Sequence, residues 1–413
     1  MNDPLIRFEN VSKSYGDNHV LRGLNLSIHK GQITAIVGKS GEGKSVLLKH
    51  IIGLIEKDSG EIFFEGRPVS RMKKAEKKAM KKKFSYMFQE TALFDSMTVF
   101  QNIALPLKEK TKMPKNEIRD IVLNKMAQLD LEGIESDYPS QLSGGMKKRV
   151  ALARALVTDP EIILFDEPTT GLDPIRKNAV HSMISDYQKR FGFTGVVVSH
   201  EIPDIFFISQ RIAMIDEGQI IFEGSSQEIR RTDNPVILEF IRGRESRYDH
   251  LTGMDPLSQG ERRYQEEMAR MMGNKSAFSI VLLTVENLYE IKRMAGYEAE
   301  QSALSNFSTA VRRHLRITDI CSRLGMNRLM LLLPRTDREG AKGICMNLAG
   351  KLKNGGIVNV QPYPEFCFSV SAGIAEAAQD KSIEEMITEA EISKDVFYEF
   401  NVCMLGQKQP EAL

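Results

Sequence analysis

Two groups of residues in this chain have the types and spacing needed to hold a nucleoside triphosphate. The first is GKSGEGKS, Gly38 to Ser45, which follows the apolar run QITAIV and opens the helical pattern SVLLKHIIGLI. Its glycines let backbone N–H groups curl around phosphate oxygens, and the start of the helix adds a favourable dipole. Lys44 can reach the β- and γ-phosphates, and the Ser45 hydroxyl can ligate Mg²⁺. The spacing therefore predicts a phosphate-binding loop.

The second group is a pair of acids at the end of the predicted strand in EIILFDEP. Sheets of α/β proteins bind ligands at the carboxyl ends of their strands. Asp166 suits a hard cation that bridges phosphates, directly or through water. Glu167 then suits a general base for the attacking water. Two acids at a strand end can also cap a helix or pair on the surface, but beside a phosphate loop they predict metal binding and catalysis.

A third segment, QLSGGMKKRVALARAL, offers another helix start suited to anions. Ser143, Gly144 and Gly145 open this predicted helix, so its first N–H groups are available to an oxyanion. A single phosphate site needs only one anion-binding helix start. A nucleotide cleft that uses two of them is closed by a second copy of the domain.

The elements that position these groups predict two domains. Strands in residues 5–38, followed by helices alternating with apolar strands to about residue 230, indicate an α/β domain with a largely parallel sheet. The pattern lapses into turn formers and charges around 242–262, which predicts a linker and the opening of a second domain. A β-α-β-β-α-β order then favours a ferredoxin-like α+β domain with helices on one face. The predicted domains are 1–244 and 245–413, the second opening at about Asp249.

The order of the three motifs resembles one known family. LSGGM between GKSGEGKS and LFDEPTTGLDP is similar to the ATP-binding-cassette (ABC) family, over residues 5–243. The resemblance implies a P-loop NTPase fold and hydrolysis of ATP with Mg²⁺. It also implies a homodimer in which two cassettes sandwich two ATP molecules, with Leu142 to Met146 of one copy facing the phosphate loop of the other.

The same resemblance assigns roles to further residues. Tyr15 would stack on adenine, although it could be only an exposed strand aromatic. Gln89 would touch Mg²⁺ or the water and relay contact to a membrane partner. Asp173 would cross the dimer interface, and His200 would contact the γ-phosphate and hold Glu167 and water in register. The implied catalytic residues are Lys44, Gln89, Glu167 and His200; the metal ligands are Ser45, Gln89 and Asp166; the nucleotide-binding residues are Tyr15, Gly38, Lys39, Ser40, Gly41, Gly43, Lys44, Ser45, Ser143, Gly144, Gly145 and Asp173.

Finer similarity narrows the kind of transporter. FDSMTV and SGGMKKRVALARA resemble the ATPases of the Mla (maintenance of lipid asymmetry) and Mce-associated systems. This implies a subunit on the cytoplasmic face of a Gram-negative inner membrane. There it would power a separate permease that exchanges phospholipid, or a similar hydrophobic molecule, with a periplasmic Mce-domain protein. A cassette for another substrate stays an alternative. A cassette acting on DNA or ribosomes is less favoured, because two cassettes or long coiled coils are not visible.

Composition agrees with a soluble cytoplasmic protein. Lys+Arg (56) nearly balance Asp+Glu (55), so no overall field favours nucleic acid. No apolar run approaches the roughly 18–20 residues that span a bilayer, and the first residues lack a signal peptide's apolar segment. The four cysteines show no zinc spacing and are expected to be reduced. The basic stretch 71–84 is either a solvated helix face or a contact with an anionic leaflet.

The second domain resembles the GGDEF (diguanylate cyclase) family from about Asp249 to Gly406. DHLTGM matches the opening motif, and SRLGMNRLMLLLP stands where R-x-GGDEF-x-x-LLP would. In this register Thr284 replaces the first metal-binding aspartate, and Asn327 and Arg328 replace two acids. Condensing two nucleoside triphosphates needs metal held by carboxylates. The domain is therefore expected to lack cyclase activity.

One remnant of that family remains in the C-terminal part of the chain. Arg316 and Asp319 form R-x-x-D, with five residues between Asp319 and Gly325, which is the spacing of the family's inhibitory site for cyclic di-GMP. A guanidinium there can pair with guanine and phosphate. Alternatively, Arg316 is solvated charge and Asp319 begins a turn. The hypotheses for this domain are thus a cyclic di-GMP sensor that gates the cassette, a dimerisation domain, or a docking site for a regulator.

Overall fold

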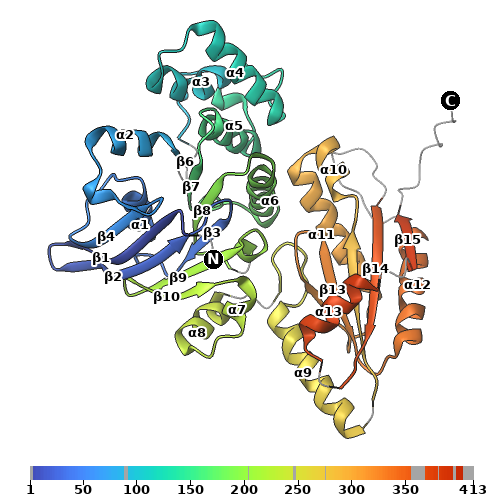
Figure 1. Cartoon of the computed structure of the whole chain (residues 1–413). Helices are drawn as coiled ribbons and strands as arrows, with labels where there is room; N and C mark the ends of the chain where they lie inside the picture. Colours follow the sequence, from blue (N-terminus) through green and yellow to red (C-terminus); the bar gives the residue numbers. More distant parts are fainter. Residues whose placement is uncertain are drawn as a thin grey trace. The chain divides into compact units, whose positions relative to one another are not determined.

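The computed structural model describes residues 3–87, 92–202, 204–244, 248–274, 276–354, 368–379, 381–393 and 397–402. The chain forms two compact units, shown in Figure 1. The first comprises Met1–Leu172 and Val180–Arg244, and the second comprises Asp173–Ala179 and Glu245–Leu413.

The first unit contains two sheets. One is antiparallel, in the order β2-β1-β4-β5, and the other has six strands in the order β10-β9-β3-β8-β7-β6. In the second sheet β9, β3, β8, β7 and β6 run parallel and only β10 is antiparallel, as the sequence predicted. The strands are β1 (Ile6–Tyr15), β2 (Asn18–Ile28), β3 (Ile33–Val37), β4 (Ser59–Phe64), β5 (Arg67–Pro68), β6 (Phe84–Met87), β7 (Ile162–Asp166), β8 (Thr194–Ser199), β9 (Arg211–Asp216) and β10 (Gln219–Gly224).

Helices surround these sheets, and a buried cluster joins the sheets to α1. Leu26, Leu47 and Val196, from β2, α1 and β8, are members of this cluster. The strands β3 and β8 are buried along their whole length, and apolar residues such as Ile36 and Val197 form their centres. The helices are α1 (Lys44–Ile51), α2 (Lys74–Lys82), α3 (Val99–Lys110), α4 (Lys115–Gln128), α5 (Gly144–Leu156), α6 (Pro174–Phe191), α7 (Ser226–Arg230) and α8 (Pro235–Arg244), with 3₁₀ turns at Val69–Arg71, Pro139–Gln141 and Asp204–Phe207. The first residues of α6, as far as Ala179, belong to the second unit.

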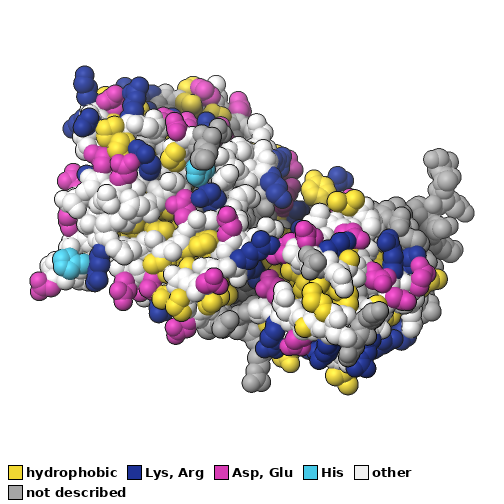
Figure 2. Space-filling model, turned by 60° about the horizontal axis from the view of Figure 1, so that its bottom comes forward, with side chains coloured by type: hydrophobic (Ala, Val, Ile, Leu, Met, Phe, Trp, Pro, Cys, Tyr) yellow, Lys and Arg dark blue, Asp and Glu magenta, His cyan; other side chains and the backbone are white. Residues whose placement is uncertain are grey.

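On the face of the molecule drawn in Figure 2, Lys and Arg side chains lie next to Asp and Glu side chains, with apolar side chains between them. The basic stretch falls largely on α2, of which only Met80 is buried. Lys81 Nζ donates to the Gly53 carbonyl at 2.8 Å, and Lys83 pairs with Glu65 and Glu161. Among the described residues, no helix is both long and apolar enough to cross a membrane.

The second unit is built on a five-stranded antiparallel sheet in the order β12-β13-β11-β14-β15. The strands β12 and β13 form a hairpin around the turn that contains Gly325, as the apolar run 329–333 and the turn residues 325–327 predict. The strands are β11 (Ser279–Val285), β12 (Ile320–Arg323), β13 (Arg328–Leu333), β14 (Phe368–Glu376) and β15 (Phe397–Val402), and the helices are α9 (Leu257–Asn274), α10 (Leu288–Ala295), α11 (Tyr297–His314), α12 (Arg338–Asn354) and α13 (Ile383–Ile392).

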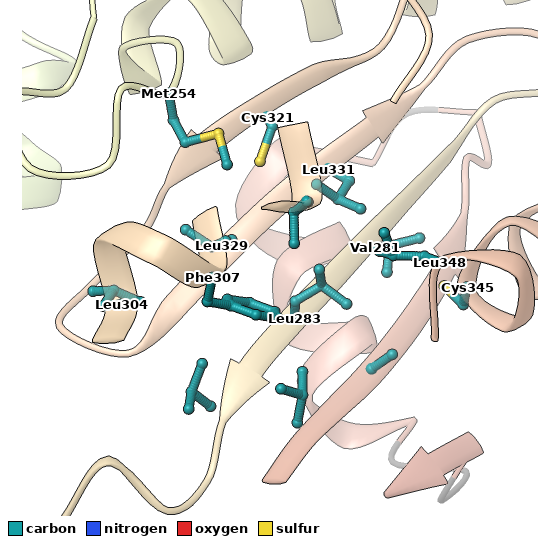
Figure 3. Close-up of a cluster of buried hydrophobic side chains, with 14 of the residues drawn as sticks. Met254, Val281, Leu283, Leu304, Phe307, Cys321, Leu329, Leu331, Cys345 and Leu348 are labelled. Carbon is teal, nitrogen blue, oxygen red and sulfur yellow. The ribbon is translucent and has the colours of Figure 1, made fainter. Parts of the chain in front are cut away.

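Both faces of this sheet are covered, so the expectation of helices on one face was wrong. Figure 3 shows the cluster on one face, where Leu283 and Leu329 meet Phe307 of α11. On the other face Leu282 and Met330 pack with residues of α9 and α13. Neighbouring residues of a strand point to opposite faces, so the unbroken apolar runs of β11 and β13 fill both layers. The described cysteines, Cys321 and Cys345, are free and buried, and burial raises the pKa of both thiols.

The helix α9 was missed in the sequence, which predicted a linker and turn formers as far as residue 262. Pro256 precedes its first turn and Gly260 lies within it. A Cβ at Gly260 would lie 2.9 Å from both Ser322 Oγ and Met330 Cε. The glycine that looks like a helix breaker therefore lets α9 approach the sheet closely.

Candidate functional site

The phosphate loop has the geometry expected from its glycines. It connects β3 to α1, and Gly41 and Gly43 have φ of 90° and 92°. A side chain at Gly43 would place Cβ 2.8 Å from Val20 Cγ1, so this position needs glycine for both reasons. Lys44, only 5% exposed, donates from Nζ to the carbonyls of Gly38 (3.0 Å) and Lys39 (2.7 Å). The ammonium is therefore held inside the loop, at the start of α1, where the helix dipole also favours an anion.

Two of the predicted metal ligands, Ser45 and Asp166, meet beside this loop. Ser45 Oγ donates to Asp166 Oδ1 at 3.0 Å, and Tyr86 OH donates to Asp166 Oδ2 at 2.7 Å. Burial, and then Asp166, raise the pKa of Tyr86, so the phenol remains a protonated donor. Hydroxyl and carboxylate oxygens are the hard ligands that Mg²⁺ prefers, and the two predicted ligands are in contact. These residues fit the cation that the nucleotide site requires.

The predicted general base is the next residue along the chain. Glu167 has a left-handed backbone with φ of 47°, and its N–H donates to the Val198 carbonyl at 3.0 Å. Thr170 Oγ1 donates to Glu167 Oε2 at 2.9 Å, and His200 Nδ1 lies 3.2 Å from Glu167 Oε1. Strained backbone is often kept where a side chain must be aimed. The structure thus brings together Glu167 and His200, which are far apart in the sequence.

The LSGGM segment and Asp173 both begin helices. Ser143 caps α5 by accepting from the Met146 N–H at 3.2 Å, and Ser143 and Gly144 are exposed while Leu142 is buried. Asp173 precedes α6, and its carboxylate accepts from the Arg176 N–H at 3.1 Å. Both features leave a helix N-terminus at the surface, where an anion or a partner chain can reach it.

Two predicted residues stand apart from this group. Tyr15 ends β1 with 51% of its surface exposed, and the Lys13 ammonium lies 5.4 Å from its ring centroid. One face of the ring therefore carries a cation, and the exposed ring is suited to stacking on a base. Gln89 lies outside the described residues.

Sequence reasoning missed several residues that hold the site. Tyr86 donates to Asp166, Thr170 donates to Glu167, and Lys148 Nζ donates to the Pro168 carbonyl at 2.8 Å. Lys148 is buried, which lowers its pKa. A weak signal existed for Tyr86, because it lies three residues before Gln89, which the family resemblance had singled out. Its hydrogen-bond partner, Asp166, could not be predicted, because that contact depends on which strand lies next to β6.

In the second unit, the positions that carry acids in the GGDEF motif are occupied by other contacts. Thr284 pairs with Arg328 across β11 and β13, and Arg328 forms an ion pair with Glu391 of α13. Asn327 Nδ2 donates to the Val285 carbonyl at 3.1 Å. Among the described residues, no group of three His, Cys, Asp or Glu is arranged to hold a metal. These residues do not fit the metal that cyclase chemistry requires.

Arg316 and Asp319 are close together but differ in availability. Asp319 is 8% exposed, and its Oδ2 accepts from the Arg316 N–H at 2.9 Å, so its carboxylate closes a local turn. The Arg316 side chain lines a polar pocket of about 380 Å³ that also includes Arg335 and the start of α12. The Arg316 side chain therefore faces a polar pocket, whereas the Asp319 carboxylate is used to close a local turn.

The fold and this geometry define a P-loop nucleotide-binding protein, and comparison with known proteins gives the family. Residues 21–170 match the ABC transporter family and residues 246–394 match the GGDEF domain of diguanylate cyclases. The intermembrane phospholipid transport system ATP-binding protein MlaF of Haemophilus influenzae is 39% identical over 243 residues, which is 59% of this chain and 92% of the relative. The chain belongs to the ABC transporter family of ATP-binding proteins and carries a GGDEF-family domain in its C-terminal part.

Two further similarities describe the cassette. The probable ribonucleotide transport ATP-binding protein mkl of Mycobacterium bovis is 37% identical over 58% of this chain and 67% of the relative. The structure of cbiO1 from Clostridium perfringens, part of the ABC transporter complex cbiONQ, superposes with a TM-score of 0.52 at 29% identity. That match covers 58% of this chain and 96% of the other. The expected P-loop cassette fold is thus confirmed.

A glycine substitution tests the loop geometry. Gly43→Ala should destabilise the protein by about 2–3 kcal/mol, because it combines a left-handed alanine with a clash against Val20, and ATP affinity should fall roughly tenfold. The matched control is Gly31→Ala, which has a φ of 72° but nothing within 4 Å of its Cβ; it should cost only about 1 kcal/mol and leave ATP affinity unchanged. Thermal unfolding and calorimetric titration measure both effects. Equal losses in the two variants would contradict the clash.

Proposed function

We propose that this chain is the ATP-hydrolysing subunit of a transporter that moves phospholipid, or a similar hydrophobic molecule, at the inner membrane. The observation that carries the proposal is the meeting of Ser45, Asp166, Glu167 and His200 at one edge of the parallel sheet. In this proposal residues 1–244 form the cassette, and residues 245–413 form a regulatory or interaction domain.

The side chains divide the chemistry between them. Lys44 and the loop N–H groups bind the phosphates, while Ser45, Asp166 and Gln89 hold Mg²⁺, which offsets the negative charge of the phosphates when bound. Glu167 accepts the proton of the attacking water, and His200 and Thr170 orient its carboxylate. Tyr15 stacks on the adenine.

A second copy of the chain completes the proposed site. Ser143 and Gly144 are exposed at the start of α5, so the N–H groups there can reach a phosphate bound by the partner. Gly145 belongs to the same turn, and Asp173 lies at the start of another helix. We therefore propose a homodimer with two ATP molecules between the cassettes.

The proposed membrane partner binds a groove in the first unit. The groove has a volume of about 480 Å³ and is mostly apolar, with exposed Leu54 and Phe94 and with three basic side chains, Lys81, Lys110 and Arg154. Ala92 and Phe94 of its wall follow Gln89 closely in sequence. We propose that a cytoplasmic segment of the permease occupies it, because that segment could then act on Gln89. The chain would be a cytoplasmic protein held peripherally at the membrane.

Similarity to the phospholipid transport ATPase supports the choice of substrate. The sequence motifs FDSMTV and SGGMKKRVALARA agree with it, and the permease would pass the lipid to or from an Mce-domain protein. The mycobacterial relative is described as a probable ribonucleotide transporter subunit, so a different substrate is the alternative. We propose no nucleic-acid partner, since basic and acidic residues nearly balance and charges of both signs are mixed on the face drawn in Figure 2.

Removing the proposed base tests the ATPase. Glu167→Gln should lower the ATP turnover rate roughly a hundredfold or more, because the amide cannot accept the proton, while ATP binding and ATP-dependent dimerisation persist. Steady-state hydrolysis and size-exclusion chromatography measure these. As a control, Glu132→Gln, an exposed acid between α4 and α5, should leave both unchanged. Normal turnover in Glu167→Gln would remove the assignment of the base.

The same variant tests the substrate in cells. In a strain lacking the protein, the wild type should restore the distribution of phospholipid between the inner and outer membranes, and Glu167→Gln should not. Mass spectrometry of separated membranes gives the readout. An unchanged phospholipid distribution after deletion would favour the alternative substrate.

We further propose that the GGDEF-family domain has no cyclase activity. Thr284 and Asn327 supply no carboxylate, and Arg328 places a positive charge where a cation would bind and is paired with Glu391. The acid nearest in sequence, Glu286, accepts a hydrogen bond from Ser371. Cyclic di-GMP formation needs metal-bound phosphates, which these side chains cannot support.

Incubation with GTP tests that proposal. The purified protein with GTP and Mg²⁺ or Mn²⁺ should form no cyclic di-GMP by mass spectrometry, while an active cyclase assayed alongside does. Turnover that disappears in Glu286→Gln would show that the remaining acid supports catalysis and would overturn the proposal.

A second candidate function is the binding of cyclic di-GMP as a signal that gates the cassette. The pocket that contains Arg316 and Arg335 is concave and polar, and two guanidinium groups suit phosphates and guanine. Asp319, however, is engaged with the Arg316 backbone. We therefore place the main contact on Arg316.

Calorimetric titration with cyclic di-GMP tests this candidate. Wild type should release heat on binding, and Arg316→Ala should weaken binding roughly tenfold or more, because a charge-assisted contact is lost. The matched control is Arg313→Ala, an exposed arginine near the end of α11 that does not line the pocket; it should bind like wild type. No heat with the wild type would remove the candidate.

A further inference from the structure

Tyr86 lies outside the motifs that bind ATP, yet it touches the carboxylate of the metal site. It is the third residue of β6, and its hydroxyl donates to Asp166 Oδ2 at 2.7 Å, while Ser45 Oγ donates to Oδ1. Each oxygen of Asp166 therefore has a hydroxyl donor, one from β6 and one from α1. Two donors on opposite oxygens fix the rotation of the carboxylate plane.

The surroundings of Tyr86 make this contact strong. The side chain is half-buried, and the neighbouring carboxylate is the acceptor. Hydrogen bonds to ionised acceptors are shorter and stronger than neutral ones. A carboxylate offers about four lone-pair sites, so Asp166 keeps free positions for a cation or its water after accepting from both hydroxyls. Tyr86 thus orients the Asp166 carboxylate and leaves lone pairs of that carboxylate available to the cation.

The same side chain forms part of the groove wall. Tyr86 lines the groove together with Phe94, Leu105 and Arg154. Ser85 and Phe84 of β6 also line it, so the strand that presents the hydroxyl is itself part of the wall. One residue therefore contacts both the metal ligand and the surface proposed for the permease.

We propose that Tyr86 is a positioning residue that aims Asp166 at Mg²⁺ and links the groove to the metal site. This inference rests on the proposed function, in which MgATP binds at Ser45 and Asp166 and a permease segment occupies the groove. If Mg²⁺ favours one position of Tyr86, metal binding changes the affinity of the groove for the permease segment. Because coupling between two sites is reciprocal, occupancy of the groove then changes the affinity for Mg²⁺ by the same factor. The link uses a hydroxyl and a carboxylate and is distinct from a route through Gln89.

The Mg²⁺ dependence of nucleotide affinity tests the positioning role. Calorimetric titration with the non-hydrolysable analogue AMP-PNP, in Mg²⁺ or in EDTA, gives the factor by which Mg²⁺ strengthens binding. Tyr86→Phe should lower that factor roughly tenfold, because the outer hydrogen bond to a metal ligand is lost. Affinity in EDTA should stay unchanged, whereas the thermal unfolding temperature of the ligand-free protein should fall slightly, because a charge-assisted hydrogen bond is lost.

The matched control is Tyr187→Phe. It removes a phenol hydroxyl from α6, where the ring packs on Phe191, and should leave the Mg²⁺ factor at its wild-type value. A merely structural role of Tyr86 would lower affinity in Mg²⁺ and EDTA alike. That result, or an unchanged Mg²⁺ factor in Tyr86→Phe, would overturn the proposal.

A fluorescent reporter tests the link to the groove. The chain has no tryptophan, so Phe94→Trp places one indole on the exposed groove wall. Its emission with AMP-PNP should shift when Mg²⁺ replaces EDTA, and the shift should disappear when Tyr86→Phe is added. A shift that persists in the double variant would refute the link. Failure of the ATPase proposal is a separate outcome, because it would appear as wild-type protein that does not bind or hydrolyse ATP.

Discussion

The chemistry of the first unit depends on the parallel pairing of four strands. Parallel neighbours end at the same edge of a sheet, so the chain leaves β3, β8, β7 and β6 at one place. The phosphate loop, His200 and the Asp166–Glu167 pair follow the first three of these strands. Antiparallel pairing would send half of these groups to the opposite edge. Backbone hydrogen bonds within the sheet therefore hold together side chains that are up to 160 residues apart, roughly the span from the phosphate loop to His200.

The local parts of the site could be predicted from the sequence because their partners are close in the chain. Gly41, Gly43 and Lys44 form one loop, and its spacing alone specifies the geometry. The meeting of Glu167 and His200 was implied by the resemblance to the ATP-binding-cassette family. Tyr86 could not be assigned, because its contact with Asp166 requires β6 to lie beside β7, and strand order is set by packing over the whole unit.

The second unit shows a similar limit. The hairpin and the ferredoxin-like order of elements followed from apolar runs and turn residues. The second layer of helices was missed although the sequence carried a signal for it, because the unbroken apolar runs of β11 and β13 are typical of strands that are buried on both faces. The helix α9 was hidden by Pro256 and Gly260, and only the contact of Gly260 with Ser322 and Met330 explains why that glycine is there.

The ion pair between Arg328 and Glu391 also restricts how this domain can change. An acid at position 328 would face Glu391 from α13, and two carboxylates at contact distance repel each other in a partly shielded setting. Replacing either residue alone leaves an unmatched charge, so the residue types at positions 328 and 391 constrain each other.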